Sequence, residues 1–288
     1  MQITDVKING MRNPIGYEYK NPRISWKVRD TEAKHQTGAR IEAAKDAGFQ
    51  DIFCLKEGED LSSLGERLEI ELKPYTRYYV RVQVENELGE KAVSDPVYFE
   101  TGKMDQPWIG KWITTQEGDD FHPVFCRVFR PAGKVRSARL YISGLGLFKA
   151  ELNGKPVSEE VLTPYYSNYH DEIQYLTFDI TDILREENTL KVSLGNGWYK
   201  GKFGLAGLKE NFGSRFQMIA EIRITCEDGS VQVIPTDENW TYTGSDTEAS
   251  DIYDGEVLNR LLWEGKANEE KHAVLTEAEG KLVERYSL

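Results

Sequence analysis

The chain has 288 residues, 39% of them hydrophobic and 29% charged, and its formal net charge is −12. This length is enough for two ordinary domains with sizeable cores. The acidic balance argues against a nucleic-acid partner, because a phosphate-binding surface needs clustered Lys and Arg side chains.

Residues 1–103 are predicted to form a small all-β domain, because short strand-like runs recur between turn residues. The runs cover Ile3–Ile8, Arg23–Val28, Ala39–Ala44, Arg67–Leu72, Tyr78–Glu85 and Val97–Thr101. The run at Tyr78–Glu85 alternates as expected of a half-buried antiparallel strand. About seven such strands in about 100 residues indicate an immunoglobulin-type sandwich with Trp26 as its central core aromatic.

Pieces of this first domain also resemble fibronectin type III domains. NPRISWKV is similar to their early strand, LKPYTRYYVRVQVENELGE to their late strand pair and VSDPVYFETG to their closing strand. Asp46–Cys54 is consistent with either a helical turn or an irregular loop. No catalytic constellation is visible, and the histidine of this domain, His35, lies in a polar loop.

The linker KMDQPWIGKWIT follows, and we place the domain boundary near Met104 because Pro107 and Gly110 interrupt regular structure. Residues 104–288 are predicted to form a second strand-rich domain. Its predicted strands are Pro123–Arg130, Ala138–Ser143, Phe148–Leu152, Gln174–Ile180, Thr189–Leu194, Phe216–Cys226, Val231–Pro235 and Trp240–Gly244. Their spacing and turn residues predict a two-sheet jelly roll, a pattern shared with galactose-binding-like sandwiches.

Three local signals in the second domain concern turns. Asn153-Gly154 predicts a tight turn after a strand. Thr181 is a candidate N-cap for a short helical turn at Asp182–Arg185. The glycines of GLGLFKAELNG lie between strands and not before a helix, so they are predicted to form turns and not a phosphate-binding loop.

Several features bear on the cellular compartment. The three cysteines, Cys54, Cys126 and Cys226, are far apart and form no CxxC pair, which favours buried reduced thiols over a zinc site or disulfides. The N-terminus lacks the basic and apolar segments of a signal peptide, and no apolar run reaches membrane-spanning length. We therefore predict a cytoplasmic protein without a membrane partner.

Catalytic motifs are not singled out by the sequence. A glycosidase needs two carboxylates held across one sugar, but none of the 48 acidic residues forms a pair marked by its spacing. The four histidines (His35, His122, His170 and His272) lie neither beside a nucleophile elbow nor at metal-ligand spacing. The sequence therefore predicts neither a catalytic triad nor a transition-metal site.

Sugar binding is better supported, because flat aromatic faces and planar polar side chains gather in residues 138–204. The candidate carbohydrate-binding residues are Tyr165, Tyr166, Asn168, Tyr169, Asn196, Trp198, Tyr199, Phe203, Asp254 and Glu256, with His170 nearby. The alternative is that each ring plugs the core at a strand end. A calcium site is a weaker candidate, at Ser158 with Glu159 and Glu160 or at Asp251, Asp254 and Glu256, because no EF-hand pattern is present.

At these residues the chain resembles the N-terminal region of bacterial α-L-rhamnosidases. The pieces that carry the resemblance are ARLYISGLGLFKAELNGKPV, LTPYYSNYHDEIQYLTFDITDIL, LGNGWYKGKFG and TDENWTYTGSDTEASDIYDGEV, preceded by a linker similar to PWIGKWI. The resemblance implies a fibronectin-like domain, a jelly-roll module, and an extension toward further β-domains and an (α/α) six-hairpin barrel. The inverting catalytic carboxylates would lie in that barrel, so we expect this chain alone not to hydrolyse rhamnosides.

The resemblance also implies that the jelly roll of some members is a calcium-assisted rhamnose-binding module. This chain departs from the pattern at two places. Val257-Leu258-Asn259-Arg260 replaces a tyrosine, aspartate, alanine and arginine, and Ser158-Glu159 replaces a glycine-aspartate pair. Both departures replace residues that would hold the sugar and the metal.

The leading hypothesis is a non-catalytic N-terminal segment of an α-L-rhamnosidase-like glycoside hydrolase. Its partners would be the C-terminal catalytic domains and a rhamnose-containing saccharide, and Ca²⁺ is the only cofactor considered. The alternative is a structural or protein-interaction β module without sugar binding. An autonomous enzyme is the third and weakest hypothesis.

Overall fold

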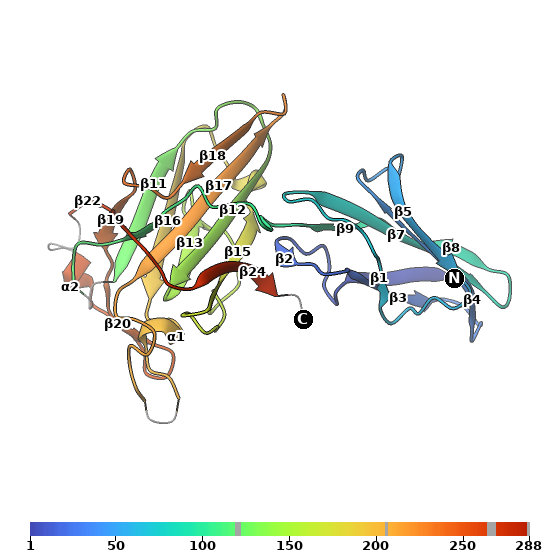
Figure 1. Ribbon diagram of the computed structural model, residues 1–288, viewed down its shortest axis with the longest axis horizontal. Helices are drawn as coiled ribbons and strands as arrows, with labels where there is room; N and C mark the ends of the chain where they lie inside the picture. The colour runs from blue at the N-terminus through green and yellow to red at the C-terminus, as the bar shows by residue number, and fades with distance from the viewer. Residues whose placement is uncertain (119–121, 205–206, 264–268, 287–288) are drawn as a thin grey trace. The chain divides into compact units, whose positions relative to one another are not determined.

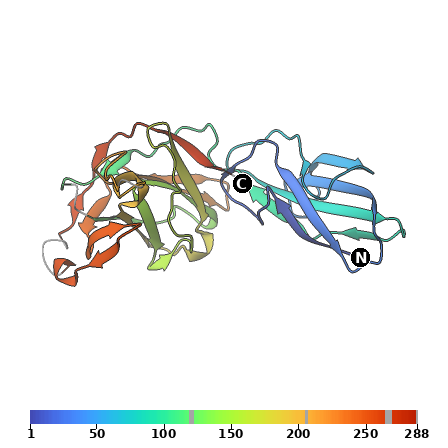
Figure 2. The ribbon, with the colours of Figure 1, turned by 90° about the horizontal axis from the view of Figure 1, so that it is seen from below.

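The computed structural model describes residues 1–118, 122–204, 207–263 and 269–286. The chain divides into two compact units, each built from antiparallel β-sheets (Figures 1 and 2). Unit 1 comprises Met1–Gln106 together with residues 284–286 near the C-terminus, and unit 2 comprises Pro107–Val283. The all-β prediction is confirmed.

Unit 1 is a two-sheet sandwich. Its strands are β1 Gln2–Ile8, β2 Tyr17–Glu18, β3 Arg23–Arg29, β4 Gln36–Ala44, β5 Ile52–Gly58, β6 Glu66–Arg67, β7 Arg77–Asn86, β8 Lys91–Val93 and β9 Val97–Glu100. One sheet has the order β1-β3-β6, and the other has the order β5-β4-β7-β8 with β9 also paired to β7. The core between them contains Trp26, which is 3% exposed and confirms the sequence prediction.

Strand β7 shows why its sequence predicts its place. Its side chains alternate between half-buried and buried positions along the whole strand, with Tyr78, Val80, Val82 and Val84 facing the core. Apolar side chains with a period of two place one complete face against the opposite sheet. The strand therefore forms the centre of the larger sheet of unit 1.

Two local predictions in unit 1 were wrong or incomplete. The expected strand at Arg67–Leu72 is confined to β6, Glu66–Arg67. In the undecided segment Asp46–Cys54, the Asp46 carboxylate accepts hydrogen bonds from the backbone N–H groups of Gln50 and Asp51, at 3.0 and 2.8 Å. A short acidic side chain that bonds its own backbone competes with the strand ladder, so β5 starts only at Ile52.

Unit 1 is completed by residues from the C-terminal end of the described chain. Strand β24, Lys281–Tyr286, pairs parallel with β2 through Arg285 opposite Tyr17. The Arg285 guanidinium lies 4.3 Å from the centre of the Tyr17 ring, and Glu284 accepts a hydrogen bond from the Met104 backbone N–H at 3.0 Å. Arg285 is buried as a result. The first unit is therefore discontinuous in sequence.

Unit 2 is the predicted two-sheet sandwich. Its strands are β10 Trp112–Thr114, β11 Pro123–Phe129, β12 Val135–Leu145, β13 Leu147–Leu152, β14 Lys155–Pro156, β15 Glu172–Asp179, β16 Asn188–Gly195, β17 Gln217–Cys226, β18 Val231–Pro235, β19 Thr241–Gly244, β20 Thr247–Asp251, β21 Gly255–Leu258, β22 Lys271–His272 and β23 Val274–Thr276. One sheet runs β24-β15-β12-β17-β10-β23, with β18 also paired to β17. The other runs β14-β13-β16-β11-β19-β22, and β20 and β21 form a separate hairpin.

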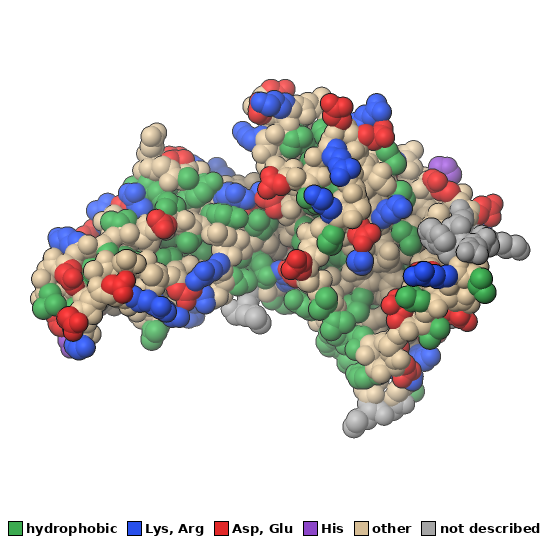
Figure 3. Space-filling view, turned by 180° about the vertical axis from the view of Figure 1, so that it is seen from behind, with side chains coloured by type: hydrophobic (Ala, Val, Ile, Leu, Met, Phe, Trp, Pro, Cys, Tyr) green, Lys and Arg blue, Asp and Glu red, His purple; other side chains and the backbone are tan. Residues whose placement is uncertain are grey.

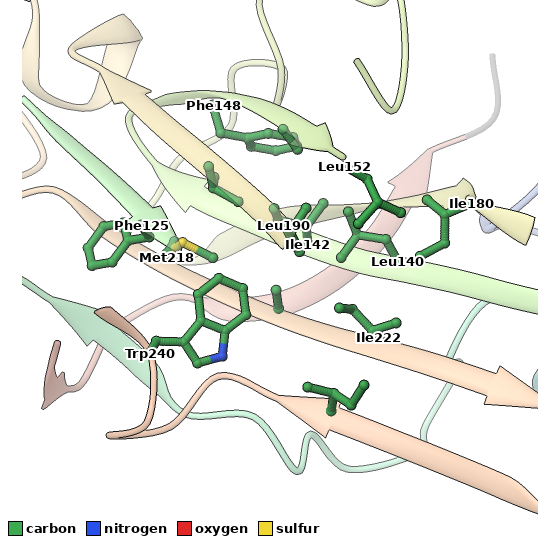
Figure 4. Packing of buried hydrophobic residues seen from close by; sticks show 14 of the residues in the cluster. Phe125, Leu140, Ile142, Phe148, Leu152, Ile180, Leu190, Met218, Ile222 and Trp240 are labelled. Atoms are coloured by element: carbon green, nitrogen blue, oxygen red, sulfur yellow. The ribbon is translucent and has the colours of Figure 1, made fainter. Parts of the chain in front are cut away.

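The main core of unit 2 lies between these sheets (Figure 4). Both sheets contribute aliphatic and aromatic side chains, among them Phe125 on β11, Leu140 on β12 and Met218 on β17. Trp240, just before β19, is fully buried, and its indole N–H donates to the Pro235 carbonyl at 2.9 Å. Burial of an aromatic ring with its polar atom paired makes this tryptophan a central support of the sandwich.

The linker is fixed to unit 2 by close backbone packing. A Cβ atom on Gly110 would lie 2.8 Å from the Ala220 carbonyl oxygen, so only glycine fits there without a shift. The buried carboxylate of Glu221 accepts hydrogen bonds from the backbone N–H groups of Ile109 and Gly110. The glycine of PWIGKWI is therefore explained by close approach to the sheet.

Helical structure is sparse in the described residues. It consists of the 3₁₀ turn η1 Thr181–Ile183 and the short helices α1 Gly197–Lys200 and α2 Arg260–Trp263. Thr181 was wrongly predicted as an N-cap, because Ile180 holds that position and the Thr181 hydroxyl accepts from the Ala138 backbone N–H at 2.9 Å. The Asn153-Gly154 turn is confirmed, with positive φ at both residues. Among the described residues, no helix is long and apolar enough to cross a membrane.

Candidate functional site

A cluster of five aromatic rings lies on unit 2, outside the main core. It consists of Tyr166, Tyr169, Tyr199, Phe203 and Phe212, and we call it the ring cluster. Tyr166 stacks on Phe203 with 5.0 Å between ring centres and 15° between planes. Tyr169 lies at its centre, 5.4 Å from Tyr199 and 5.1 Å from Phe212. Four of these five rings were sequence candidates, and Phe212 was missed.

The ring cluster has a buried side and an exposed side. Tyr169 and Tyr199 pack into a second hydrophobic cluster with Trp112 and Ile219. These two rings therefore fill the core, which was the alternative to sugar binding. Burial raises the pKa of both tyrosines, which keeps their hydroxyls neutral. Tyr166 is 44% exposed. Figure 3 shows hydrophobic side chains gathered on the lower part of this unit, where the loop before β15 and helix α1 lie.

Glycines bring the turn between β12 and β13 close to the start of α1. Gly146 has a φ of +112°, and a Cβ there would lie 2.5 Å from the Gly195 carbonyl oxygen. Gly197 has a φ of +54°, and a Cβ there would lie 2.6 Å from Cγ of Leu147. Two backbones can approach this closely only where side chains are absent. These contacts position the segment 196–203, which supplies four candidate residues.

On its other side, the same segment forms polar contacts with the β20–β21 hairpin. The Asn196 amide donates to the Ser250 carbonyl at 2.7 Å, and the Lys202 backbone N–H donates to the Asp251 carboxylate at 2.8 Å. Lys202 also pairs with Asp254 through its ammonium group. Residues 196–203 therefore join the ring cluster to the hairpin, and so bring together candidates that are far apart in sequence.

Other candidates occupy different settings. Asn168 forms a turn, because its backbone carbonyl accepts from Asp171 and Glu172 at 2.9 Å each. Trp198 is half-buried against the second hydrophobic cluster, and Tyr165 is 45% exposed. Glu256 accepts a hydrogen bond from the Thr247 hydroxyl at 3.1 Å.

The structure adds Lys202, Ser250 and Phe212 to the site. Asn196 and Phe203 were recognised because they lie in the glycine-aromatic cluster GNGWYKGKFG. Phe212 and Ser250 carry no comparable local signal, since only folding brings them to this segment. The glycine that follows Phe212 in NFG is a weak local hint for it.

The calcium candidates do not form a preformed cage. Glu159 and Glu160 are exposed in the loop after β14, and the Glu160 backbone N–H donates to the Ser158 hydroxyl at 3.0 Å. Within the described ranges, no group of three or more His, Cys, Asp or Glu side chains could hold a metal ion. Calcium binding therefore stays a prediction from the resemblance.

Asp251 is expected to anchor the hairpin. Burial alone would raise the pKa of its carboxyl, but backbone N–H groups of Lys202, Tyr253 and Asp254 hold that pKa below its ordinary value of 3.8. A lowered pKa in the folded state stabilises the protein above the unfolded pKa, and this contribution is lost as pH falls through the folded value. Asp251→Ala should lower the free energy of unfolding by about 1–2 kcal/mol at neutral pH.

Urea unfolding at neutral pH and at pH values below 3.8 would measure this effect. The difference between Asp251→Ala and the unchanged chain should shrink in acid. Asp254→Ala is the matched control on the same hairpin, and because its carboxylate is 57% exposed, its effect should stay within about 0.5 kcal/mol. An equal loss in both variants would contradict the anchoring role of Asp251.

Comparison with known families identifies both units. A model described as "Alpha-L-rhamnosidase N-terminal domain" matches residues 133–273, and one described as "Rha78A-like, N-terminal immunoglobulin domain" matches residues 3–105. The two units are N-terminal domains of the alpha-L-rhamnosidase family. The resemblance found in the sequence is confirmed, and unit 1 is of the immunoglobulin type, whereas the narrower fibronectin type III assignment stays a prediction.

Curated relatives support this family assignment. An alpha-L-rhamnosidase of Formosa agariphila is 28% identical over 274 residues, a match that covers 88% of this chain and 30% of the relative. One from Streptomyces avermitilis is 33% identical over 130 residues, covering 45% of this chain and 12% of the relative. The chain thus spans about 30% of the length of the first of these relatives.

Solved structures share the fold of this chain. The alpha-L-rhamnosidase from Dictyoglumus thermophilum superposes with a TM-score of 0.82 at 26% identity, over 97% of this chain and 34% of that one. The Streptomyces avermitilis alpha-L-rhamnosidase complexed with L-rhamnose has a TM-score of 0.84 at 17% identity, over 99% of this chain and 46% of that one. This second likeness concerns the fold alone.

Proposed function

We propose that the chain is the non-catalytic N-terminal part of a glycoside hydrolase that acts on rhamnose-containing saccharides, and that unit 2 binds L-rhamnose or a related neutral sugar. Its curated relatives are alpha-L-rhamnosidases, of which it spans about 30%. One observation carries the sugar-binding part. The stacked pair Tyr166 and Phe203 is partly exposed beside the polar hairpin.

The chemistry of this arrangement suits a sugar. The C–H face of a pyranose packs on a flat aromatic ring, and its hydroxyls need planar groups that donate and accept. Asn196 holds the hairpin beside the rings, because its amide donates to the Ser250 carbonyl at 2.7 Å. Asp254 and Glu256 on the same hairpin add exposed carboxylates.

Isothermal titration of the full chain with L-rhamnose tests this proposal. We expect saturable heat at millimolar sugar, and Tyr166→Ala should weaken binding by about 3- to 10-fold because it removes the exposed stacking face. Tyr98→Ala is the matched control, since Tyr98 is a partly exposed tyrosine of unit 1. Parallel titrations with calcium and with a chelator examine the metal prediction.

The absence of heat with millimolar rhamnose would contradict sugar binding and leave only the supporting role in the larger hydrolase. An assay with an aryl rhamnoside addresses catalysis, and we expect no turnover by this chain. Turnover that disappears on replacing Asp254 or Glu256 would overturn the non-catalytic assignment. Light scattering would distinguish a protein-interaction role, which predicts self-association that sugar does not change.

A further inference from the structure

A depression of about 510 Å³ lies on unit 1, on the outer face of the sheet β5-β4-β7-β8. All four strands contribute to it. Cross-strand pairing places Arg40 between Glu57 and Gln83, and it places Glu85 between Gly38 and Lys91. The volume falls within the range of about 300–1,000 Å³ that is typical of small-molecule sites.

Glycine makes this part of the sheet hollow. Gly38 lines the depression, and a Cβ atom on it would meet only the Gly58 carbonyl oxygen, at 4.0 Å. Its φ lies outside the left-handed region, so neither the backbone conformation nor crowding requires glycine here. A larger side chain at this position would fit without strain and would fill the depression.

The polar groups around the depression match a neutral ligand. Lys91 pairs with Glu85 at 2.9 Å, and Arg40 pairs with the buried Glu42 at 2.7 Å and lies 3.7 Å from Glu57. Glu59 adds a further carboxylate to the lining, so negative charge is in slight excess. The Gln83 amide has no hydrogen-bond partner among the described residues, and it lies opposite Val93, which is 56% exposed. Carboxylates at this surface disfavour an anion. The planar Gln83 amide beside one exposed apolar side chain suits the hydroxyls and C–H groups of a sugar.

A peptide strand is a poorer occupant. The backbone N–H and C=O groups of β4 and β7 are already paired on both sides within the sheet, so a peptide could not extend the ladder at this face. Recognition must therefore use side chains. We propose that this depression is a second saccharide-binding site, which takes one or two neutral sugar residues and does not depend on the site proposed in unit 2.

Selective ¹⁵N-glycine labelling of the full chain tests this proposal, because Gly38 and Gly58 report on the depression while Gly195, Gly197 and Gly201 report on unit 2. We expect saturable amide shifts of Gly38 and Gly58 on titration with L-rhamnose or D-galactose. Gly38→Leu should weaken the response of Gly58 at least about tenfold by filling the depression. Gln83→Ala should weaken it by about 3- to 10-fold through loss of a hydrogen-bonding group.

Leu55→Ala is the matched control. Leu55 is 51% exposed on β5, opposite Glu42 and outside the depression, so this variant should bind sugar unchanged. Unchanged signals of the remaining glycines would show that Gly38→Leu is folded. The proposal is overturned if Gly38 and Gly58 do not shift with tens of millimolar of either sugar, or if the Gly58 shift persists in Gly38→Leu. Shifts confined to Gly195, Gly197 and Gly201 would leave only the unit 2 site.

Discussion

Replacing Trp240 by alanine is expected to lower the free energy of unfolding of unit 2 by about 3–5 kcal/mol. The indole is fully buried between the two sheets (Figure 4). Its N–H donates to the Pro235 carbonyl at 2.9 Å. Alanine would leave a cavity that the close-packed neighbours fill only in part. The substitution also leaves the half-buried Pro235 carbonyl without this donor.

Differential scanning calorimetry would measure this loss. Because two units need not unfold in one step, the transition of each unit has to be assigned before a free energy is given. Only the transition of unit 2 should move. Val128→Ala serves as the control, since Val128 is 55% exposed on β11 and its truncation should cost no more than about 0.5 kcal/mol. A loss below about 1 kcal/mol for Trp240→Ala would contradict its central packing role.

Gly146→Ala is expected to have the second largest effect. A φ of +112° is strained for any residue with a Cβ, at about 1–3 kcal/mol. The added Cβ would also lie 2.5 Å from the Gly195 carbonyl oxygen and 3.0 Å from the Phe216 ring, and overpacking of this kind costs about 1–3 kcal/mol more. The backbone at Gly195 must then move, which would displace α1 and the ring cluster.

Chemical denaturation and the rhamnose titration together measure this prediction. Gly154→Ala is the matched control, because Gly154 also has a positive φ but a Cβ there would meet nothing within 4 Å. It should cost only about 1 kcal/mol and leave sugar binding unchanged. Equal stability losses in the two variants would show that the close contact with Gly195 is not important.

Strands with a regular apolar pattern could be predicted from the sequence. Tyr78–Glu85 lies within β7, and Phe216–Cys226 corresponds closely to β17, because one or both faces of these strands are buried. The hairpin of β20 and β21 was missed. Its sequences TEASD and GEVL give exposed or half-buried side chains, so no face of it repeats an apolar signal.

The candidate site was predicted only in part, for a similar reason. Ring-rich segments could be recognised, but the sequence could not separate buried Tyr169 and Tyr199 from exposed Tyr166, since all three are tyrosines outside the strands. The partners Phe212 and Ser250 depend on tertiary contacts: a Cβ on Gly195 would lie 3.2 Å from the Ser250 hydroxyl oxygen, and a Cβ on Gly213, next to Phe212, would lie 2.5 Å from Cζ of Tyr199. Local sequence patterns carry no information about close contacts between segments that are far apart in the sequence.

The discontinuity of unit 1 has a consequence for its biosynthesis. Its first hundred residues are synthesised before any of unit 2, but Glu284 and Arg285, which contact Met104 and Tyr17, are synthesised after unit 2. The nascent unit 1 must therefore wait for its last segment with the Tyr17 strand unpaired. A gene fragment that stops near residue 106 would encode an incomplete domain. This immunoglobulin unit therefore cannot be moved to another protein as residues 1–106 alone.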